Sequence, residues 1–197
     1  RQTLQKTLDS LEATMSNYEV IVLNYGSTDD LDSFIRPFLI AYPKLRYIVT
    51  RTPTHFHMSR AKNIVGKCAN KDVLCFLDAD NHLSIHFVNY IIKHFNFATE
   101  TMRCTDTFFT KGLAGRIICR KNLFHKKRGY PENIEGYGEE DNIFLFNTTC
   151  HEIPYCISHN SVINHTDEER MENYATKNIN NVHTVFKENL TYGYVKD

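Results

Sequence analysis

The sequence lacks the features that mark several common classes of protein. Its 23 lysines and arginines are matched by 23 aspartates and glutamates, so it has no positive excess of the kind that nucleic-acid-binding proteins usually carry. No apolar run approaches the roughly 18 residues that span a bilayer, and no secretory signal opens the chain. Repeats, low-complexity tracts and linkers rich in Pro, Gly or Ser are also missing. What remains is one globular domain of 197 residues, 42% of them hydrophobic, which is enough for a substantial core.

The six cysteines include no pair with the Cys-x-x-Cys spacing of a zinc or redox site. Several lie among apolar neighbours, as Cys75 does within residues 73–77, where cysteine behaves as a small hydrophobic side chain. We therefore expect buried free thiols. Cysteine usage and the missing signal favour a cytoplasmic location, while attachment to a membrane surface and a catalytic fragment from the Golgi lumen stay open as alternatives.

Strands and helices alternate along the first half of the sequence. Ser59 is the predicted N-cap of one of the helices. Apolar runs predict strands at 18–23, 45–50 and 72–77, and helical spacing of apolar residues predicts helices at 1–15, 31–41, 60–70 and 84–96. This alternation indicates an α/β fold with a mostly parallel sheet flanked by helices. Such sheets bind ligands at the carboxyl ends of their strands.

Beyond residue 96 the alternation fades. Strands are expected at 107–110 and 115–119, a closing strand pair at 152–163, and a partly helical segment at 168–190. The polar, glycine-containing stretch 125–141 is predicted to be a functional loop.

Asp78 and Asp80 follow directly on the apolar third strand. Residues i and i+2 of an extended segment point the same way, so both carboxylates can face one site. Hard oxygen ligands of this kind suit Mg²⁺ or Mn²⁺. A solvated turn with an aspartate that caps the next helix would have the same sequence, so both interpretations stay open.

A second acidic cluster follows two glycines within residues 136–142. Glu139, Glu140 and Asp141 are adjacent, and like charges so close together resist joint ionisation, which favours a general base. The alternative is a helix N-terminus, where acidic side chains favour the helix dipole. The two interpretations are compatible, because residues 141–144 can open a helix.

Basic and histidine side chains supply weaker signals. Arg60 and Lys62 lie at the start of a predicted helix, where free amides and a forked guanidinium attract phosphate oxygens, unless this is an ordinary capped surface helix. His165 follows an apolar strand and is either structural or, with the aspartate pair, a ligand suited to Mn²⁺. Together the motifs describe a site for a nucleoside diphosphate, a divalent cation and a base.

In their order, these motifs resemble those of GT-A glycosyltransferases of the family 2 type. Residues 20–29 resemble the family's strand that ends in Asp-Asp-Gly-Ser, with Asn and Tyr in place of the two acids. Residues 59–63 resemble the Arg-Ala-Lys segment of β1,4-galactosyltransferases, where the arginine contacts UDP, and residues 76–80 match the metal-binding Asp-x-Asp turn. The resemblance implies a set of donor-binding residues: Asn24, Tyr25, Gly26, Ser27, Arg60 and Asp78.

The later acidic segment resembles the same enzymes. Residues 128–141 are similar to the galactosyltransferase segment with Gly-Phe-Pro and then Gly-Trp-Gly-Gly-Glu-Asp, and to the matching part of bacterial chondroitin-type polymerases. The resemblance makes Asp141 the inverting general base. Tyr137 takes the place of the family's tryptophan as an aromatic platform for sugar. The implied substrate-binding residues are Tyr137, Gly138, Glu139 and Glu140.

Residues 163–166 match the family's late Ile-Arg-His segment. The resemblance therefore makes His165 the last metal ligand, beside Asp78 and Asp80. It implies a single Rossmann-like GT-A domain over residues 1–197, with a nucleotide-binding half at about 1–96 and an acceptor half at about 97–197. The family's usual first strand has no counterpart, because the sequence starts at the helix after it, and we expect a chain that lacks its native N-terminus.

The implied activity is that of a hexosyltransferase of polysaccharide biosynthesis. It would use a UDP-sugar and Mn²⁺ or Mg²⁺, and would transfer the sugar to a hydroxyl of a glycan or glycoconjugate. A non-catalytic nucleotide- or sugar-binding module and a metal-dependent nucleotide-sugar hydrolase are the alternatives. The sugar, the acceptor and the linkage depend on the shape of the pocket. Whether the domain is a module of a larger protein or of an oligomer stays open.

Overall fold

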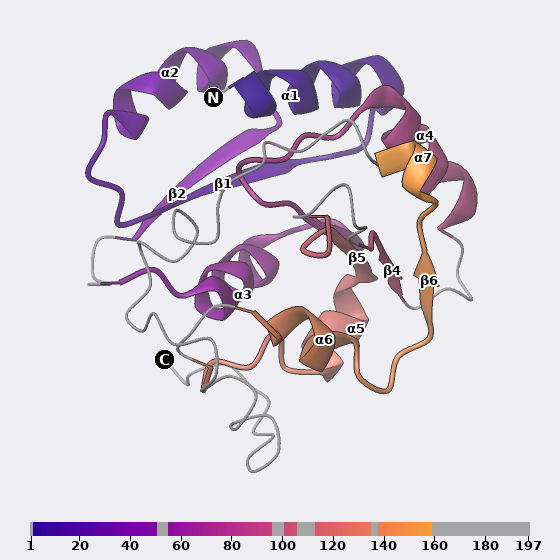
Figure 1. The fold of residues 1–197 in the computed structure, drawn as a ribbon. Coiled ribbons are helices and arrows are strands. Elements are labelled where there is room, and N and C mark those ends of the chain that lie inside the picture. Colours follow the sequence, from indigo (N-terminus) through magenta and orange to yellow (C-terminus); the bar gives the residue numbers. More distant parts are fainter. Residues whose placement is uncertain (1, 51–54, 96–100, 106–112, 135–137, 159–197) are drawn as a thin grey trace. The chain divides into compact units, whose positions relative to one another are not determined.

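A computed structural model describes residues 2–50, 55–95, 101–105, 113–134 and 138–158 (Figure 1). The chain forms two compact units, each assembled from separate stretches of sequence. The first unit comprises Arg1–Tyr18, Asp72–Leu123 and Leu145–His165, and the second comprises Glu19–Lys71, Phe124–Phe144 and Thr166–Asp197. Each unit has its own sheet.

The second unit is built on a parallel pair of strands, β1 (Val20–Tyr25) and β2 (Leu45–Thr50). Parallel neighbours need a crossover connection, which here contains α2 (Leu31–Ala41). Helix α2 packs on β2, and α3 (Met58–Cys68) packs on β1. The carboxyl end of β1 is therefore followed by a turn that leads into a helix, as in other α/β sheets that bind ligands at this edge.

The first unit contains a mixed sheet. Its strands are, in spatial order, β3 (Val73–Phe76), β5 (Ile117–Arg120), β4 (Thr101–Arg103) and β6 (Cys150–Glu152). The central β5 is antiparallel to both of its neighbours, whereas β4 and β6 are parallel. Ile117, Ile118 and Cys119 of β5 are fully buried, as expected for a strand that has partners on both sides and lies in a core.

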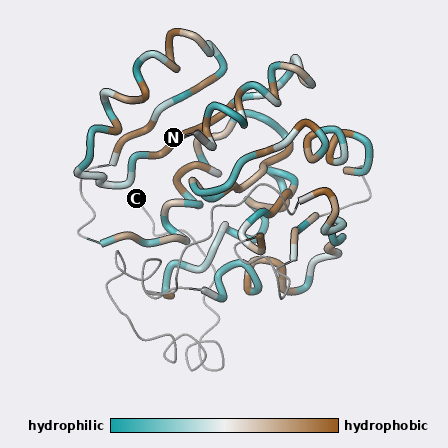
Figure 2. Tube along the Cα trace, turned by 45° about the horizontal axis from the view of Figure 1, so that its top comes forward, coloured by the Kyte–Doolittle hydropathy of each residue, from teal (hydrophilic) through white to brown (hydrophobic). Residues whose placement is uncertain are grey.

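Helices complete each unit. In the first unit α1 (Gln2–Thr14) packs against α4 (Ile85–His94), and α7 (Tyr155–Ser158) also contacts α4. Hydrophobic and hydrophilic residues alternate along the helices in Figure 2, which is the pattern of helices that bury one side. Two short helices, α5 (Lys121–Lys126) and α6 (Glu140–Leu145), each begin in one unit's stretch of sequence and end in the other's.

The α/β class is confirmed, and the helix at 31–41 and the strand at 45–50 have the predicted boundaries. The prediction of mostly parallel pairing was wrong: within the described residues two of the four strand pairings are antiparallel. Both involve β5, which follows the part of the chain where strands and helices alternate. Alternation is the sequence signal for parallel pairing, so it could not set the direction of this strand.

Two local predictions need correction, and two more lie outside the described residues. Helix α3 begins at Met58 and its N-cap is His57, whose ring accepts from the amide of Arg60, so Ser59 is buried inside the first turn and is not the cap. Within the described part of the predicted strand pair at 152–163, β6 ends at Glu152 and is followed by α7, which begins directly after Pro154; residues 159–163 lie outside the described residues. The predicted strand at 107–110 and helix at 168–190 lie outside the described residues.

Each of the six cysteines lies within the described residues, and none forms a disulfide. Cys104 and Cys119 are buried as expected, but Cys75 and Cys156 are exposed. No helix among the described residues is long and apolar enough to cross a membrane.

Candidate functional site

The turn that follows β3 holds the aspartate pair in the first unit. The side-chain amide of Asn81 donates to Asp80 Oδ1 at 2.7 Å, and its backbone amide donates to the carbonyl of Asp78 at 2.9 Å. From α1, Thr3 Oγ1 donates to the carbonyl of Ala79 at 2.7 Å. The backbone carbonyls of Asp78 and Ala79 and the carboxylate of Asp80 are therefore held by neighbouring groups.

A buried arginine supports this turn. Arg116 has 0% exposure, and its guanidinium donates to Asn81 Oδ1 from Nη2 and, at 3.1 Å, from Nε. Its Cζ lies 5.6 Å from the ring centre of Phe87. Burial lowers the pKa of Arg116, while nearby thiols and the carboxylates of Asp78 and Asp80 oppose that shift. The aspartate pair thus supplies negative charge that a buried guanidinium needs.

The residue before Arg116 fits closely against the first aspartate. A Cβ added to Gly115 would lie 2.3 Å from Asp78 Oδ2, so only glycine leaves room for this carboxylate at its observed position. The observation indicates that Asp78 occupies a space shaped for it.

Two carboxylates in one turn fit a divalent cation. Among the described residues no group of three or more His, Cys, Asp or Glu side chains is arranged to hold a metal. His165, the predicted third ligand, lies outside the described residues. A set of two hard oxygen ligands is typical of Mg²⁺ or Mn²⁺ sites that water and phosphate oxygens complete.

In the second unit, the carboxyl end of β1 is organised by Asn24. This buried side chain donates to the hydroxyl of Tyr47 at 2.8 Å and to Asp32 Oδ1 at 3.1 Å, and it accepts from the amide of Ser27 at 2.8 Å. Gly26 has φ +74°, a value that glycine adopts without strain. Through these contacts the side chain of Asn24 shapes the turn at Gly26 and Ser27.

Tyr25 and Arg60 lie near each other at the same end of β1. The ring of Tyr25 packs edge-on against Phe56, with centroids 5.7 Å apart. Its hydroxyl is buried and has no hydrogen-bond partner within the described part of the chain. Burial raises the pKa of Tyr25, and so does Glu132, while Arg60 opposes the shift. A buried polar group without a partner is unusual, and Arg60 is the charged neighbour that favours its ionised form.

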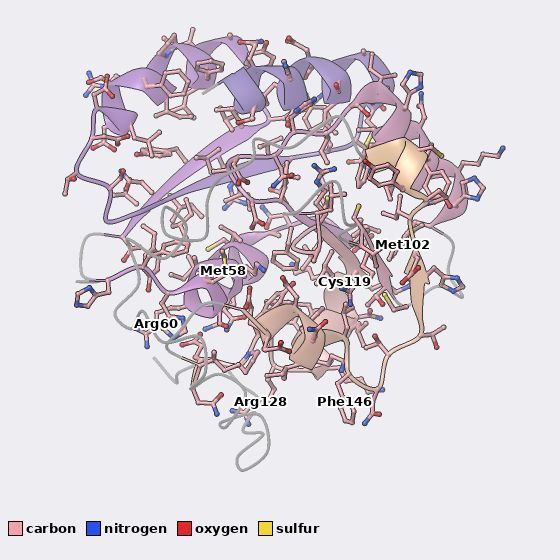
Figure 3. The ribbon with its side chains drawn as sticks, viewed as in Figure 1. Met58, Arg60, Met102, Cys119, Arg128 and Phe146 are labelled. Atoms are coloured by element: carbon pink, nitrogen blue, oxygen red, sulfur yellow. The ribbon has the colours of Figure 1, made fainter. Side chains whose placement is uncertain are left out.

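Arg60 extends from the first turn of α3 (Figure 3). Its side chain is 45% exposed, and Nε lies 3.3 Å from Glu132 Oε2. An exposed guanidinium can form two parallel hydrogen bonds to phosphate oxygens. The contact with Glu132 orients this side chain and leaves it accessible.

Lys62 joins α3 to the acidic cluster. Its Nζ lies 3.1 Å from Glu140 Oε1 and 2.7 Å from Asp141 Oδ1, and its side chain is only 7% exposed. The two acids occupy the first turn of α6, where negative charge also favours the helix dipole. The prediction that residues 141–144 open a helix is confirmed, and the catalytic candidates Glu140 and Asp141 are held together by one ammonium.

Asn63 tethers the segment that leads to this cluster. Its side-chain amide donates to the carbonyl of Tyr130 at 2.9 Å and to Glu132 Oε1 at 2.8 Å, and it accepts from the amide of Tyr130 at 2.7 Å. From the helix cap, His57 Nε2 lies 3.2 Å from the carbonyl of Glu132. Helix α3 therefore fixes residues 130–132 through the side chains of Arg60 and Asn63 and of its cap, His57.

Two residues before α6 have left-handed backbone conformations: Gly138 with φ +96° and Glu139 with φ +67°. For a residue with a side chain this conformation costs about 1–2 kcal/mol. We expect Glu139→Gly to raise the free energy of unfolding by about 1 kcal/mol, measured by urea denaturation. Glu139→Ala is the matched control, because it removes the same carboxylate and keeps the strain. Equal stability of the two variants would contradict the prediction.

The structure adds residues that the sequence analysis did not select. Asn63 and Glu132 fix the second-unit cluster, and Asn81 and Arg116 fix the aspartate turn. Arg116 could have been noticed, since a single arginine interrupts an otherwise apolar stretch at 113–119. Tyr137, the predicted sugar platform, lies outside the described residues.

Comparison with known proteins identifies one matching family. Residues 1–170 match the model of glycosyl transferase family 2. No curated protein matches the sequence.

Solved structures share the fold at low sequence identity. A mannosyltransferase from Pyrobaculum calidifontis, in complex with GDP-Man and Mn²⁺, has a TM-score of 0.62 and 14% identity over 78% of this chain and 51% of its own. A mutant Drosophila β1,4-galactosyltransferase 7, in complex with manganese, UDP-Gal and xylobiose, has a TM-score of 0.58 and 13% identity over 89% of this chain and 82% of its own. A 4-diphosphocytidyl-2C-methyl-D-erythritol synthase from Anaerococcus prevotii has a TM-score of 0.59 and 15% identity over 86% and 82%. These likenesses show the fold alone, and the chain spans about half the length of the mannosyltransferase.

Proposed function

The chain belongs to glycosyl transferase family 2, and from this premise we propose that it moves a sugar from a UDP-sugar to a hydroxyl of a glycan or glycoconjugate with inversion. The GT-A fold implied by the sequence resemblance is confirmed. The observation that carries the proposal is the cluster at the start of α6, where a buried ammonium holds Glu140 and Asp141 in place. A module that only binds a nucleotide has no need of a fixed carboxylate of this kind.

On the donor side, Asp78 and Asp80 would hold Mn²⁺ or Mg²⁺, with His165 as a third ligand. A bound cation of this type supplies positive charge that stabilises a leaving diphosphate. Arg60 would contact the diphosphate, because its guanidinium is exposed and oriented by Glu132. The turn shaped by Asn24, with Tyr25, Gly26 and Ser27, would contact the nucleoside. The resemblance of residues 59–63 to galactosyltransferases supports UDP, although one structural relative binds GDP-Man.

On the acceptor side, Asp141 would act as the general base. As the acceptor oxygen attacks the anomeric carbon, the bond from that carbon to the diphosphate oxygen breaks, and the hydroxyl proton passes to Asp141. Attack on the face opposite the leaving group inverts the configuration. Glu140, Glu139, Gly138 and Tyr137 would contact the sugars. We assign donor binding chiefly to residues 1–96 and acceptor binding chiefly to residues 97–197.

The donor assignment is tested by calorimetry of UDP binding with Mn²⁺, with Mg²⁺ and with EDTA. We expect binding that needs a divalent cation and falls at least about 10-fold in Asp80→Ala, since loss of a group that holds a metal typically costs this much or more. Asp72→Ala, an exposed position just before β3, is the matched control and should bind as the unaltered chain does. UDP binding that is equal with and without EDTA would contradict the metal site.

The reaction itself is tested by incubating UDP-sugars with and without glycan acceptors. Transfer that depends on an acceptor supports the proposal. Hydrolysis of the donor at the same rate without acceptor would favour a nucleotide-sugar hydrolase, and UDP binding without turnover of any donor would favour a binding module.

A further inference from the structure

We propose that Lys62 is a positioning residue for the general base: its ammonium holds the Asp141 carboxylate in place and keeps it ionised beside Glu140. This inference rests on the proposed function, because it assumes that Asp141 accepts the acceptor's proton. It gives Lys62 a role different from the phosphate binding that its place at a helix start suggested, because its ammonium is buried against Glu140 and Asp141.

The burial of Lys62 is the first argument. A lysine with 7% side-chain exposure gives up most of its hydration, which destabilises the fold unless the charge is paired and hydrogen-bonded. Here both conditions are met by two carboxylates, at 3.1 Å and 2.7 Å. The ring of Tyr130 adds a face 5.0 Å from Nζ, a distance at which a cation is attracted to the aromatic electrons.

The charge balance is the second argument. Before proton transfer, one ammonium faces two adjacent carboxylates, so the cluster carries a net charge of minus one. After Asp141 takes the proton, Lys62 and Glu140 remain as a neutral pair. The ammonium therefore has an anionic partner both before and after the proton transfer. Before the transfer it also offsets the repulsion between the carboxylates of Asp141 and Glu140.

Other charged or titratable groups lie on the elements next to this cluster. Arg60 lies on the same helix, Tyr25 on the strand that α3 packs against, and Glu139 precedes α6. Glu132 bonds to Arg60 and Asn63 at 3.3 Å and 2.8 Å. Of the two carboxylates that contact Lys62, Asp141 is the nearer, at 2.7 Å, so this carboxylate is the one that loss of the ammonium affects most directly.

The test compares pH–rate profiles of sugar transfer for the unaltered protein and for Lys62→Met, Lys62→Arg and Lys62→Met/Glu140→Gln. In Lys62→Met we expect the acid limb to move up by about one pH unit or more, because an opposite charge is removed and a like charge remains. The rate deficit should therefore shrink as the pH rises. Lys62→Arg should keep the unaltered midpoint, and the double variant should return toward it, because the neighbouring anion is gone as well. Lys67→Met, exposed on the same helix, is the matched control.

An unchanged acid limb in Lys62→Met overturns the proposal, since a merely structural role would lower the rate equally at all pH values. If Lys62→Met fails to fold, the double variant decides, because it leaves one buried carboxylate without the ammonium in place of two. We expect its acid limb close to that of the unaltered protein. An acid limb about one pH unit or more higher would contradict the proposal. Failure of the proposed function is distinguishable. In that case the unaltered protein shows no transfer, or Asp141→Asn transfers normally, whatever the lysine variants do.

Discussion

Asp141→Asn is expected to lower the rate of sugar transfer by about 10²–10⁴-fold, the usual contribution of a general base, while UDP binding stays within about twofold of the unaltered protein. The amide has nearly the same shape as the carboxylate and can still contact Lys62, but it cannot take the acceptor's proton. Asp141 lies in the first turn of α6. It is distant in sequence from Asp78 and Asp80, and different residues hold it in place. The expected loss is therefore in kcat, with the donor KM little changed.

The measurement is steady-state transfer from a UDP-sugar to a glycan acceptor, with UDP binding by calorimetry on the same samples. Asp72→Asn is the matched control, because it makes the same chemical change at an exposed carboxylate and should transfer normally. Transfer by Asp141→Asn within about tenfold of the unaltered rate would remove Asp141 as the base, because a base is worth at least ten times that. Equal losses of UDP binding and transfer would instead indicate a role in folding or in donor binding.

The backbone of the donor half was largely predictable from sequence. Periodicity alone placed α2 and β2 at their observed boundaries, because polar turns separate apolar runs there. The direction of β5 was not predictable, since no local pattern in the sequence sets whether a strand pairs parallel or antiparallel with a distant partner. Helix capping was also misjudged: a serine at position 59 looks like a better cap than histidine, but the His57 ring accepts from the backbone and contacts Glu132 as well.

In the candidate site, the acidic residues were predictable from the sequence and the residues that hold them were not. Carboxylates that follow strands or glycines can be recognised locally, so Asp78, Asp80, Glu140 and Asp141 were all selected from the sequence. Their supports come from residues distant in sequence, as Lys62 does for Asp141 at a separation of 79 positions. Such pairings depend on tertiary structure, which spacing along one chain does not encode. A buried charge within an apolar stretch is the useful exception, because it must find a partner.

Arg116→Met provides the largest expected effect on stability, a loss of about 2–4 kcal/mol in the free energy of unfolding. The substitution keeps an unbranched side chain of similar length but deletes a buried cation. Asn81 Oδ1 then loses both of its donors while its residue stays 2% exposed, and a buried acceptor without a partner costs about 1–3 kcal/mol. The contact with the Phe87 ring is lost as well, and Asp78 and Asp80 lose a nearby positive charge.

Urea denaturation monitored by circular dichroism measures this loss, with Arg120→Met on the same strand as the matched control. Arg120 lies at the end of β5 and is half-buried, so its replacement should cost less than about 1 kcal/mol, as most substitutions away from buried polar networks do. Arg116→Lys should fall between the two, because it restores the charge but not the two-pronged contact with Asn81. If both arginine-to-methionine variants lose the same small amount, Arg116 does not act as the buried cation of this turn. The position of the aspartate pair would then depend on other neighbours, among them Gly115, Thr3 and Asn81.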